Sequence, residues 1–371
     1  LGAGLGAFAS GERTTVSLST LKKTGSEAFA LMGELVTKPA FAAEEIERDR
    51  KSRLQALAQQ KDQPTVIASN TFAAKVYGDD HPYGRPNNGT PETIAAITRD
   101  DISRFYDAYY RPNNAVLVIV GDLTPDEAMA LATKAFGTWE KGDVPASVAA
   151  IPPRPAAHPA TVYLIDKPGA AQSEIRIGHP GAARSTNPDY YALQVLNTIL
   201  GGQFSSRINL NLRESKGYTY GARSGWSFSR GDGPFTASAG VFTAKTDSSL
   251  IEFMRELKDI RAGRPVTEEE VAFAKRTIIQ GYPRSIETNA GVVNQLADLA
   301  FFGLPEAEMT NFLTRVQAVK PADVTRVARR YLQPEQFTIV VVGDLSQIRT
   351  GVEALNLGPV TVLDADGMAL Q

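Results

Sequence analysis

The sequence predicts an α+β protein of two homologous halves, each a largely antiparallel sheet with helices packed on it. Two observations lead to this prediction. A segment near residue 110 recurs 222 positions later, and strand-length apolar runs alternate with amphipathic helices along the 371 residues. Strands and helices mixed in this way, often with two helices between strands, are typical of helices packed against an antiparallel sheet. The length is sufficient for two domains.

The internal repeat is the most informative of these features. Residues 109–123, YYRPNNAVLVIVGDL, align without a gap on residues 331–345, YLQPEQFTIVVVGDL, and seven of the fifteen positions are identical. The same offset pairs Asp101 with Asp323, so the match extends back into the preceding helix. Each copy reads as a helix, a turn with proline, a buried β-branched strand and a Gly-Asp that leads to another helix. Self-similarity of this kind indicates a duplicated unit.

The individual elements follow from alternation, turn residues and helix caps. Strands are expected at residues 14–18, 115–120, 162–165, 173–178, 218–228, 235–241 and 337–342. Capping boxes predict helices that start after Thr124 and after Thr267, each with a glutamate three residues later. Asn187 and Pro188 predict the start of a helix whose apolar face holds leucines 193, 196 and 200.

A proline-rich segment divides the chain. Residues 147–160, SVAAIPPRPAAHPA, contain four prolines in fourteen residues, and proline stiffens and extends such a segment. We therefore expect a first half at residues 1–146, a linker at 147–160 and a second half at 161–371. The first half is the shorter one, so we expect it to lack an N-terminal piece.

Composition excludes several classes of function. Thirty-nine basic and 41 acidic residues leave a net charge of −2, which provides no excess charge to attract nucleic acid. No apolar run approaches the roughly 18 residues of a membrane span. There is no cysteine, so there is no disulfide, thiolate nucleophile or cysteine metal site. We expect neither a nucleic-acid partner nor a membrane span.

Three patterns that look functional are better explained structurally. The glycines of residues 2–6 follow no strand and lack the G-x-G-x-x-G spacing of a phosphate-binding loop. The Arg-Gly-Asp of residues 230–232 is followed by another glycine, a composition that suits the tip of a hairpin. The three histidines, His81, His158 and His179, are isolated, and no pair is spaced to hold a metal on one helix face.

The stretch LRESKGYTYGARSG, residues 212–225, reads as the end of a helix, a stop at Gly217 and the start of a strand. It places Arg213 and Tyr220 seven positions apart across this joint. One interpretation is a solvated helix arginine and an edge-strand aromatic. The other is a pair of polar groups directed toward one ligand.

Three long runs, at residues 44–64, 81–124 and 192–225, together resemble the pitrilysin and mitochondrial processing peptidase family of inverted-motif zinc metallopeptidases. The resemblance covers essentially the whole chain in order and includes the duplication. It implies a clamshell of two like α+β halves, joined by a linker, that encloses an unfolded peptide.

The same resemblance implies a zinc ion held by H-x-x-E-H and by a glutamate on a downstream helix, with the motif's central glutamate activating the zinc-bound water. This chain contains no H-x-x-E-H. Active members carry the downstream glutamate ten residues after the isoleucine of a phrase like I-E-R-E-R. Ile46 opens that phrase here, and Ala56 stands at the ligand position. A methyl group cannot bind zinc, and no carboxylate lies between Arg50 and Lys61. We therefore expect no metal on this chain.

In the family's second half, an arginine and a tyrosine in a phrase like L-R-x-x-x-G-x-x-Y face the zinc site and help to bind the substrate. Arg213 and Tyr220 fit that phrase. A guanidinium can hold a peptide carbonyl, and a phenol can donate to an oxygen that gains charge. Gly201, Gly202 and Ser205 resemble the family's glycine-rich loop at the chamber mouth. Their alternative interpretation is a helix C-cap followed by an N-cap serine.

Three hypotheses follow from the resemblance. The first is a non-catalytic, substrate-binding subunit of a heteromeric zinc metallopeptidase, whose homologous partner carries the zinc and whose substrate is an unfolded peptide that can add as a strand to a sheet edge. The second is a structural role like that of the peptidase-like core subunits of respiratory complexes. The third is an independent peptidase whose metal motif was cut away. Ala56 argues against the third, and the retained Arg213 and Tyr220 favour the first over the second.

Overall fold

A computed structural model describes residues 1–145, 151–185 and 187–370, which form two compact units. Unit 1 comprises Leu1–Leu57, Asn87–Ile151 and Arg284–Glu306, and unit 2 comprises Ala58–Pro86, Pro152–Pro283 and Ala307–Gln371. The break after Ile151 falls within the expected linker at 147–160, of which residues 147–150 lie outside the described part of the chain. Because this division follows packing and not homology, the expected halves at 1–146 and 161–371 stay a prediction.

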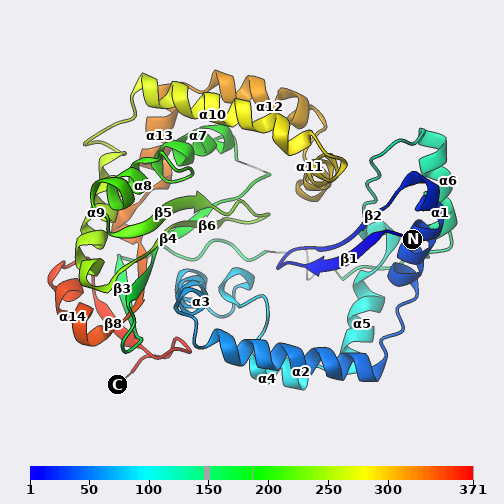
Figure 1. Ribbon diagram of the computed structural model, residues 1–371, viewed down its shortest axis with the longest axis horizontal. Helices are drawn as coiled ribbons and strands as arrows, with labels where there is room; N and C mark the ends of the chain where they lie inside the picture. The colour runs from blue at the N-terminus through cyan, green and yellow to red at the C-terminus, as the bar shows by residue number, and fades with distance from the viewer. Residues whose placement is uncertain (146–150, 186, 371) are drawn as a thin grey trace. The chain divides into compact units, whose positions relative to one another are not determined.

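Unit 2 contains a six-stranded sheet with the strand order β5-β6-β4-β7-β3-β8 (Figure 1). Its strands are β3 (Thr161–Asp166), β4 (Gln172–Ala182), β5 (Thr219–Trp226), β6 (Gly233–Phe242), β7 (Thr338–Gly343) and β8 (Val360–Leu363). The ladders that join β5, β6, β4 and β7 are antiparallel, whereas β3 pairs in parallel with β7 and β8. The sheet is therefore largely antiparallel, as the sequence predicts.

The helices of unit 2 pack on both faces of this sheet. They are α3 (Pro64–Tyr77), α7 (Tyr190–Leu200), α8 (Arg207–Asn209), α9 (Thr246–Asp259), α10 (Glu268–Ile286, which continues into unit 1), α12 (Ala307–Ala318), α13 (Pro321–Tyr331) and α14 (Leu345–Ala354). Side chains of α7, α9, α10, α13 and α14 form the larger apolar core with one face of the sheet. The expected capping box at Thr267 is present, since the Thr267 and Glu270 backbone N–H groups each bond the other's side chain.

Strand β6 shows how the two faces are separated. Its residues alternate between fully and partly buried positions, because successive side chains of a strand point to opposite faces. Phe235, Ala237 and Val241 enter the larger core. The side chains between them belong to the opposite face.

Helix α3 covers only part of that opposite face. Its Ile67 and Phe72 form a second core with Ile165 of β3 and with Val340 and Val342 of β7. Figure 1 shows α3 beside β4, away from β5. The polar side chains on this face of β4, β6 and β5 are therefore not all covered by α3.

Unit 1 is mainly helical. It contains the antiparallel hairpin β1 (Gly4–Ala9) and β2 (Thr14–Ser19) with helices α1 (Lys22–Thr37), α2 (Ala43–Gln60, which ends in unit 2), α4 (Pro91–Ala96), α5 (Arg99–Tyr109), α6 (Pro125–Phe136) and α11 (Asn289–Phe302). Phe29 of α1 meets Phe136 of α6 edge to face, with ring centroids 6.0 Å apart. The Tyr106 hydroxyl donates to the Val36 carbonyl at 2.7 Å and so ties α5 to α1.

The two copies of the repeat share their local structure. In each, a helix is followed by a short 3₁₀ turn that starts at proline, Pro112 in the first copy and Pro334 in the second. The paired aspartates make the same contact, because Asp101 and Asp323 each accept a hydrogen bond from the backbone N–H three residues earlier, at 2.8 and 3.0 Å. Helix α6 starts at the expected capping box, formed by Thr124 and Glu127.

The strand expected at residues 115–120 does not form, although its repeat partner is the central strand β7. A strand needs a neighbour for its ladder of hydrogen bonds. Strands β4 and β3 flank β7, whereas in the described residues no strand pairs with 115–120, and Val116 remains 69% exposed. The sequence also misses β1 and β8.

The glycines of residues 2–6, the Arg-Gly-Asp of residues 230–232 and His81 all lie in ordinary structural elements. The glycines of residues 2–6 extend into β1, and residues 230–232 connect β5 to β6. His81 begins a 3₁₀ turn, where its Nδ1 accepts a hydrogen bond from the Tyr83 backbone N–H at 3.0 Å.

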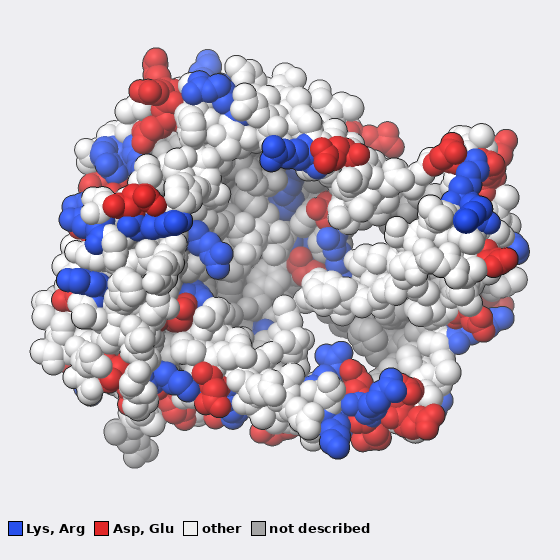
Figure 2. All heavy atoms as spheres, viewed as in Figure 1, with Lys and Arg blue, Asp and Glu red and all other residues white. Residues whose placement is uncertain are grey.

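Among the described helices, none is long and apolar enough to cross a membrane. Basic and acidic side chains are interspersed over the face that Figure 2 shows.

Removal of the Phe235 ring tests the larger core. Phe235 is fully buried and packs against Trp226 with ring centroids 4.5 Å apart. We expect Phe235→Ala to lower the free energy of unfolding by about 3–5 kcal/mol, because it leaves a cavity in a closely packed region. Urea titration followed by tryptophan fluorescence measures this loss. The matched control is Phe273→Ala, whose side chain is 43% exposed, and an equal loss in both variants would contradict the assignment.

Candidate functional site

The joint that carries Arg213 contains an unusual helical turn. After α8, the chain forms a π-helix at Leu210–Ser215. The Lys216 N–H donates to the Asn211 carbonyl, five residues earlier, at 3.0 Å. Gly217 then takes a φ of +65°, which favours glycine, and β5 begins at Thr219. The expected sequence of helix, glycine stop and strand is confirmed, but the helix is of the π type, which is rare and frequent at functional sites.

Asn211 anchors this turn to α9. Its Nδ2 donates to Glu252 Oε2 at 2.9 Å and to Glu256 Oε1 at 2.8 Å, and both glutamates are buried. Arg264 pairs with Glu256, and Arg255 pairs with Glu252, so neither buried carboxylate lacks a cation. The backbone around Arg213 is therefore held from below by a buried polar network.

Arg207 anchors the start of α8. Its guanidinium binds the Glu270 carboxylate through two hydrogen bonds of 2.7 and 2.6 Å, and it also donates to the Arg264 carbonyl at 2.6 Å. Burial acts to raise the pKa of Glu270, but hydrogen bonds from Arg207 and Thr267 outweigh burial, so this pKa lies below its ordinary value. Planar, bidentate pairs of this kind hold geometry better than single contacts.

The Arg213 side chain is accessible and already oriented. Its guanidinium lies over the Phe204 ring, 4.6 Å from the centroid, and its Nε is 3.2 Å from Glu214 Oε1. The side chain remains 40% exposed. A stacked guanidinium keeps hydrogen-bond donors at its edge available to a ligand.

Tyr220 lies in a β-bulge. Thr219 pairs with Val241 and Ala222 pairs with Ala239, so β5 has one more residue than β6 over this interval. The Thr219 hydroxyl holds the bulge, since it lies 3.1 Å from the Gly221 N–H and 2.6 Å from the Gly240 carbonyl. Bulges redirect side chains and are common beside active sites. Tyr220 is 76% exposed, with its ring against that of Phe242 at 5.8 Å.

Asn209 connects the loop before α8 to this bulge. Its Nδ2 donates to the Phe204 carbonyl at 2.7 Å, and its Oδ1 accepts the Ala222 N–H at 3.1 Å. The residue is 4% exposed. One buried side chain therefore sets the position of the loop that contacts Arg213 and of the strand that carries Tyr220.

The glycine-rich loop follows α7. Gly201 is the C-cap of that helix, with its N–H bonded to the Asn197 carbonyl, and its own carbonyl accepts the Ser224 N–H of β5 at 3.0 Å. Gly202 and Ser205 are exposed. The interpretation of this segment as a helix C-cap followed by an N-cap serine is therefore correct for the C-cap at Gly201. Ser206 stands at the N-cap position of α8 but makes no capping hydrogen bond with its side chain.

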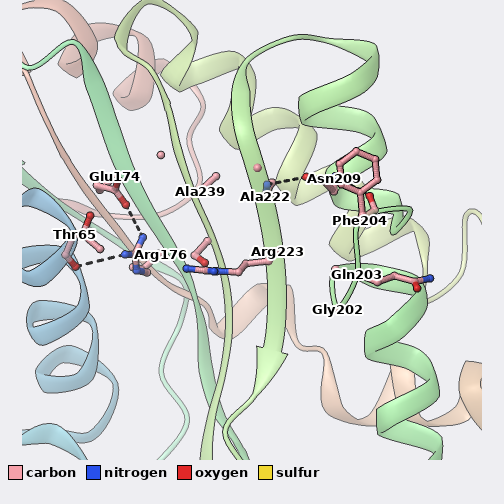
Figure 3. A pocket seen from close by; sticks show the side chains of 14 residues that line it. Thr65, Glu174, Arg176, Gly202, Gln203, Phe204, Asn209, Ala222, Arg223 and Ala239 are labelled. Carbon is pink, nitrogen blue, oxygen red and sulfur yellow. Dashed lines mark hydrogen bonds and ion pairs between the residues drawn. The ribbon is translucent and has the colours of Figure 1, made fainter. Parts of the chain in front are cut away.

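A hollow of about 470 Å³ lies beside these elements in unit 2 (Figure 3). Its lining includes Gly201, Gly202 and Phe204 of the loop together with Gly221 of the bulge. Arg213 reaches its border through contact with Phe204, and Tyr220 precedes Gly221. Of the five residues predicted for substrate binding, Gly201 and Gly202 therefore line the hollow, Arg213 contacts a lining residue, and Tyr220 and Ser205 are not part of the lining.

Ala56 belongs to unit 1, on helix α2, and is exposed. The nearest residues on its helix face, Ser52, Arg53, Gln59 and Gln60, include no carboxylate. Over the part of the chain that the structure describes, no three His, Asp or Glu side chains lie where they could share a metal ion. The residues present do not fit a zinc ion at this position.

The sequence alone did not identify Asn209, or the charged lining residues Glu174, Arg176 and Arg223. A signal was present for two of them, because Glu174 and Arg176 alternate with Ile175 and Ile177 in the expected strand at 173–178. Charges at every second position of a strand indicate a polar face. The sequence contains no such signal for Asn209, because only the fold brings its two hydrogen-bond partners, the Phe204 carbonyl and the Ala222 N–H, close to it.

Comparisons with known proteins agree with this architecture. Residues 96–278 match the family described as "Peptidase M16 inactive domain", and residues 1–86 match "Insulinase (Peptidase family M16)". An uncharacterized zinc protease of Streptomyces coelicolor is 28% identical over 338 residues, which are 90% of this chain and 72% of the relative.

Solved structures are also similar. A peptidase M16 inactive domain from Pseudomonas fluorescens superposes with a TM-score of 0.85 at 28% identity, over 92% of this chain and 81% of its own. A chain of complex III2 from Candida albicans reaches a TM-score of 0.77 at 16% identity, over 95% and 85% of the two chains. The second similarity is one of fold alone.

The bridging role of Asn209 can be tested by truncation. We expect Asn209→Ala to lower the free energy of unfolding by about 2 kcal/mol, because the buried Ala222 N–H and Phe204 carbonyl lose their partner. The Ala222 amide should also exchange its hydrogen faster. Urea titration and hydrogen exchange measure both effects. Asn311→Ala, at an exposed position of α12, is the control, and unchanged exchange at Ala222 would refute the bridge.

The pair of Arg207 with Glu270 predicts a pH dependence. A carboxyl whose pKa is lowered by folding stabilises the native state above its unfolded pKa of about 4.3, and this contribution is lost as the pH falls through the folded value. We expect Glu270→Gln to cost about 2 kcal/mol at pH 7 and progressively less below about pH 4. Urea titrations at pH 7, 5, 4 and 3 measure the difference. Glu269→Gln, one residue earlier and exposed, should change stability little at every pH.

Proposed function

The chain belongs to the M16 peptidase family, and on this premise we propose that it is a non-catalytic, substrate-binding subunit of a heteromeric zinc metallopeptidase. A homologous partner subunit would carry the zinc ion and the residues that bind it. The substrate is an unfolded peptide that is degraded or processed in an enclosed chamber. Arg213 and Tyr220 of this chain would contribute to binding that peptide at the partner's site.

The observation that supports this proposal best is the local backbone at the two side chains. Arg213 lies in a π-helical turn and Tyr220 in a β-bulge, within otherwise regular elements. Both irregularities are held by hydrogen bonds from buried side chains, those of Asn211 and Thr219. Such features cost stability or regularity and are common where a side chain must be aimed. A merely solvated arginine and tyrosine would need neither.

The division of labour rests on unit 1. By the resemblance, Ala56 stands where active relatives carry a metal-binding glutamate, and no carboxylate lies between Arg50 and Lys61 to take its place. The partner would supply that side of the site. This chain would then supply donors from unit 2, which are neutral or positive and therefore suited to peptide oxygen atoms.

The two side chains have complementary chemistry toward a peptide. The Arg213 guanidinium, stacked on Phe204, can donate in a fork to a backbone carbonyl. The Tyr220 hydroxyl can donate one hydrogen bond to an oxygen that becomes more negative during the reaction. Strand β5 is the edge of the six-stranded sheet, but its Ala222 and Ser224 N–H groups already donate to Asn209 Oδ1 and to the Gly201 carbonyl. An extended peptide that added to this edge would have to use other backbone groups of β5.

A structural subunit of a larger assembly is the second candidate. The observation that favours it is the shared fold with a chain of complex III2 from Candida albicans. Such a subunit has no use for aimed and accessible Arg213 and Tyr220 side chains. Addition of a zinc-bearing homologous chain separates the two candidates, because only the first predicts peptide cleavage.

The test mixes this chain with its zinc-motif relative from the same organism and measures cleavage of an unstructured peptide together with bound zinc. We expect little cleavage by this chain alone and a rise on mixing. In the mixture, Arg213→Ala or Tyr220→Phe should lower turnover by about 10–100-fold, because a donor to the reacting peptide is lost, with zinc content unchanged.

The control for both variants is Arg349→Ala. Arg349 is also an exposed arginine paired with a neighbouring glutamate, but it lies on α14. It should leave turnover unchanged. Normal cleavage by both the Arg213 and Tyr220 variants would show that the pair has no such role, and absence of any rise on mixing would favour the structural candidate.

A further inference from the structure

We propose that the hollow beside the Arg213 and Tyr220 elements is a subsite for a peptide carboxylate, formed by Arg176, Ser238 and Arg223. The proposal rests on the proposed function, because it assumes that a peptide occupies this face of unit 2. It adds a preference that the proposed function does not contain. Substrates with an acidic group at one position would bind better than neutral ones.

The three residues form a row across the sheet. In the strand register, Arg176 of β4 pairs with Ser238 of β6, and Ser238 pairs in turn with Arg223 of β5. Neighbouring strands lie about 4.8 Å apart, so the two arginine Cα atoms are separated by roughly 10 Å with the small serine between them. Residues directly opposite one another across paired strands point to the same face. Both long side chains can therefore reach an anion that sits above Ser238.

Arg176 is built into the fold and has its charge balanced. It is 8% exposed and pairs with Glu174 Oε2 at 3.0 Å. It also donates to the Ile175 carbonyl at 2.9 Å and lies 3.3 Å from Ser69 Oγ of α3. These contacts leave its second terminal nitrogen with a single weak contact, to the Thr65 carbonyl at 3.5 Å.

Arg223 has no such balance. Figure 3 shows its side chain directed across β6 toward Arg176. Glu174 is the one carboxylate among the residues that line the hollow, and it is paired with Arg176. Throughout the described residues, no carboxylate forms an ion pair with Arg223. Two guanidinium groups thus converge on a space that contains one negative charge.

The shape of the hollow also suits a small planar anion. Gly240, opposite Glu174 on β6, has no side chain to fill the space, and a Cβ there would stand 2.7 Å from Glu174 Oε1. Ser238 lies next to Gly240 on the same face of β6, so the floor of the hollow consists of small residues. The Ser238 hydroxyl can donate to a carboxylate from below, and the guanidinium groups can bind its two oxygens from the sides.

The hollow adjoins the proposed peptide site. Gly201, Gly202 and Phe204 line it, and Arg213 stacks on Phe204, while Tyr220 precedes the lining residue Gly221. A peptide held by Arg213 and Tyr220 would therefore carry its next groups past the row of Arg176, Ser238 and Arg223. The carboxylate could come from an Asp or Glu side chain or from the peptide's C-terminus, which are the same chemistry.

The experiment measures binding of four fluorescent peptides to the full chain by anisotropy. The peptides share one sequence and differ in having Glu or Gln at one central position and a free or amidated C-terminus. We expect at least one carboxylate, internal or terminal, to strengthen binding about tenfold over the neutral peptide. The advantage should shrink as salt is added. Which of the two carboxylates gives the advantage identifies its source.

Variants connect the preference to the row. Arg223→Gln should abolish the advantage, so that charged and neutral peptides bind alike, whereas Glu174→Gln should increase the advantage by removal of the competing negative charge. Arg349→Gln, on α14 and outside the hollow's lining, should have no effect. Arg176 is not used, because it also bonds Ser69 of α3 and the Ile175 carbonyl, and its loss would disturb the contact of α3 with the sheet.

The outcomes separate this proposal from the proposed function. Equal binding of all four peptides, or an advantage that survives Arg223→Gln, would overturn the carboxylate subsite and leave a peptide-binding role intact. Failure of every peptide to bind would overturn both. A carboxylate advantage that disappears in Arg223→Gln but persists in the control Arg349→Gln supports the subsite.

Discussion

The incomplete cover of one sheet face by α3 is the constraint on which the rest of this molecule depends. The larger core buries the other face under the remaining helices of unit 2, so the hydrophobic stabilisation of this unit does not need α3 to reach β5. Polar side chains of β4, β6 and β5 can therefore remain on the uncovered part without being trapped in an apolar core. The hollow lies along this part, and Arg213 contacts Phe204 in its lining.

The uncovered face is positioned by buried polar contacts at its border. Asn209 joins the loop to the bulge, Asn211 joins the π-turn to α9, and Arg207 joins α8 to α10. Each contact leaves a buried donor or acceptor unpaired when it is broken, which makes the arrangement more rigid than exposed ion pairs would. The accessible side chains of Arg213 and Tyr220 therefore project from backbone segments that buried hydrogen bonds hold in place.

Local patterns predicted the fold well where the contacts are local. The capping boxes at Thr124 and Thr267 and the glycine stop at Gly217 depend on residues within a few positions, and all three are present. The strand expected at 115–120 failed for the opposite reason. Its sequence repeats that of β7, but a strand forms only where other strands lie beside it, and nothing local to these residues states whether they do.

The sequence by itself determined the α+β class, the repeat and the helix-to-strand joint, because each of these is a pattern of spacing along one chain. Only the tertiary structure decided that the joint is a π-turn, that Tyr220 sits in a bulge, and that Arg176, Ser238 and Arg223 form one row. The register of β4 on β6 and of β6 on β5 creates that row. Register is set by which faces the whole sheet buries, and a shift of one residue would turn these side chains to the other face.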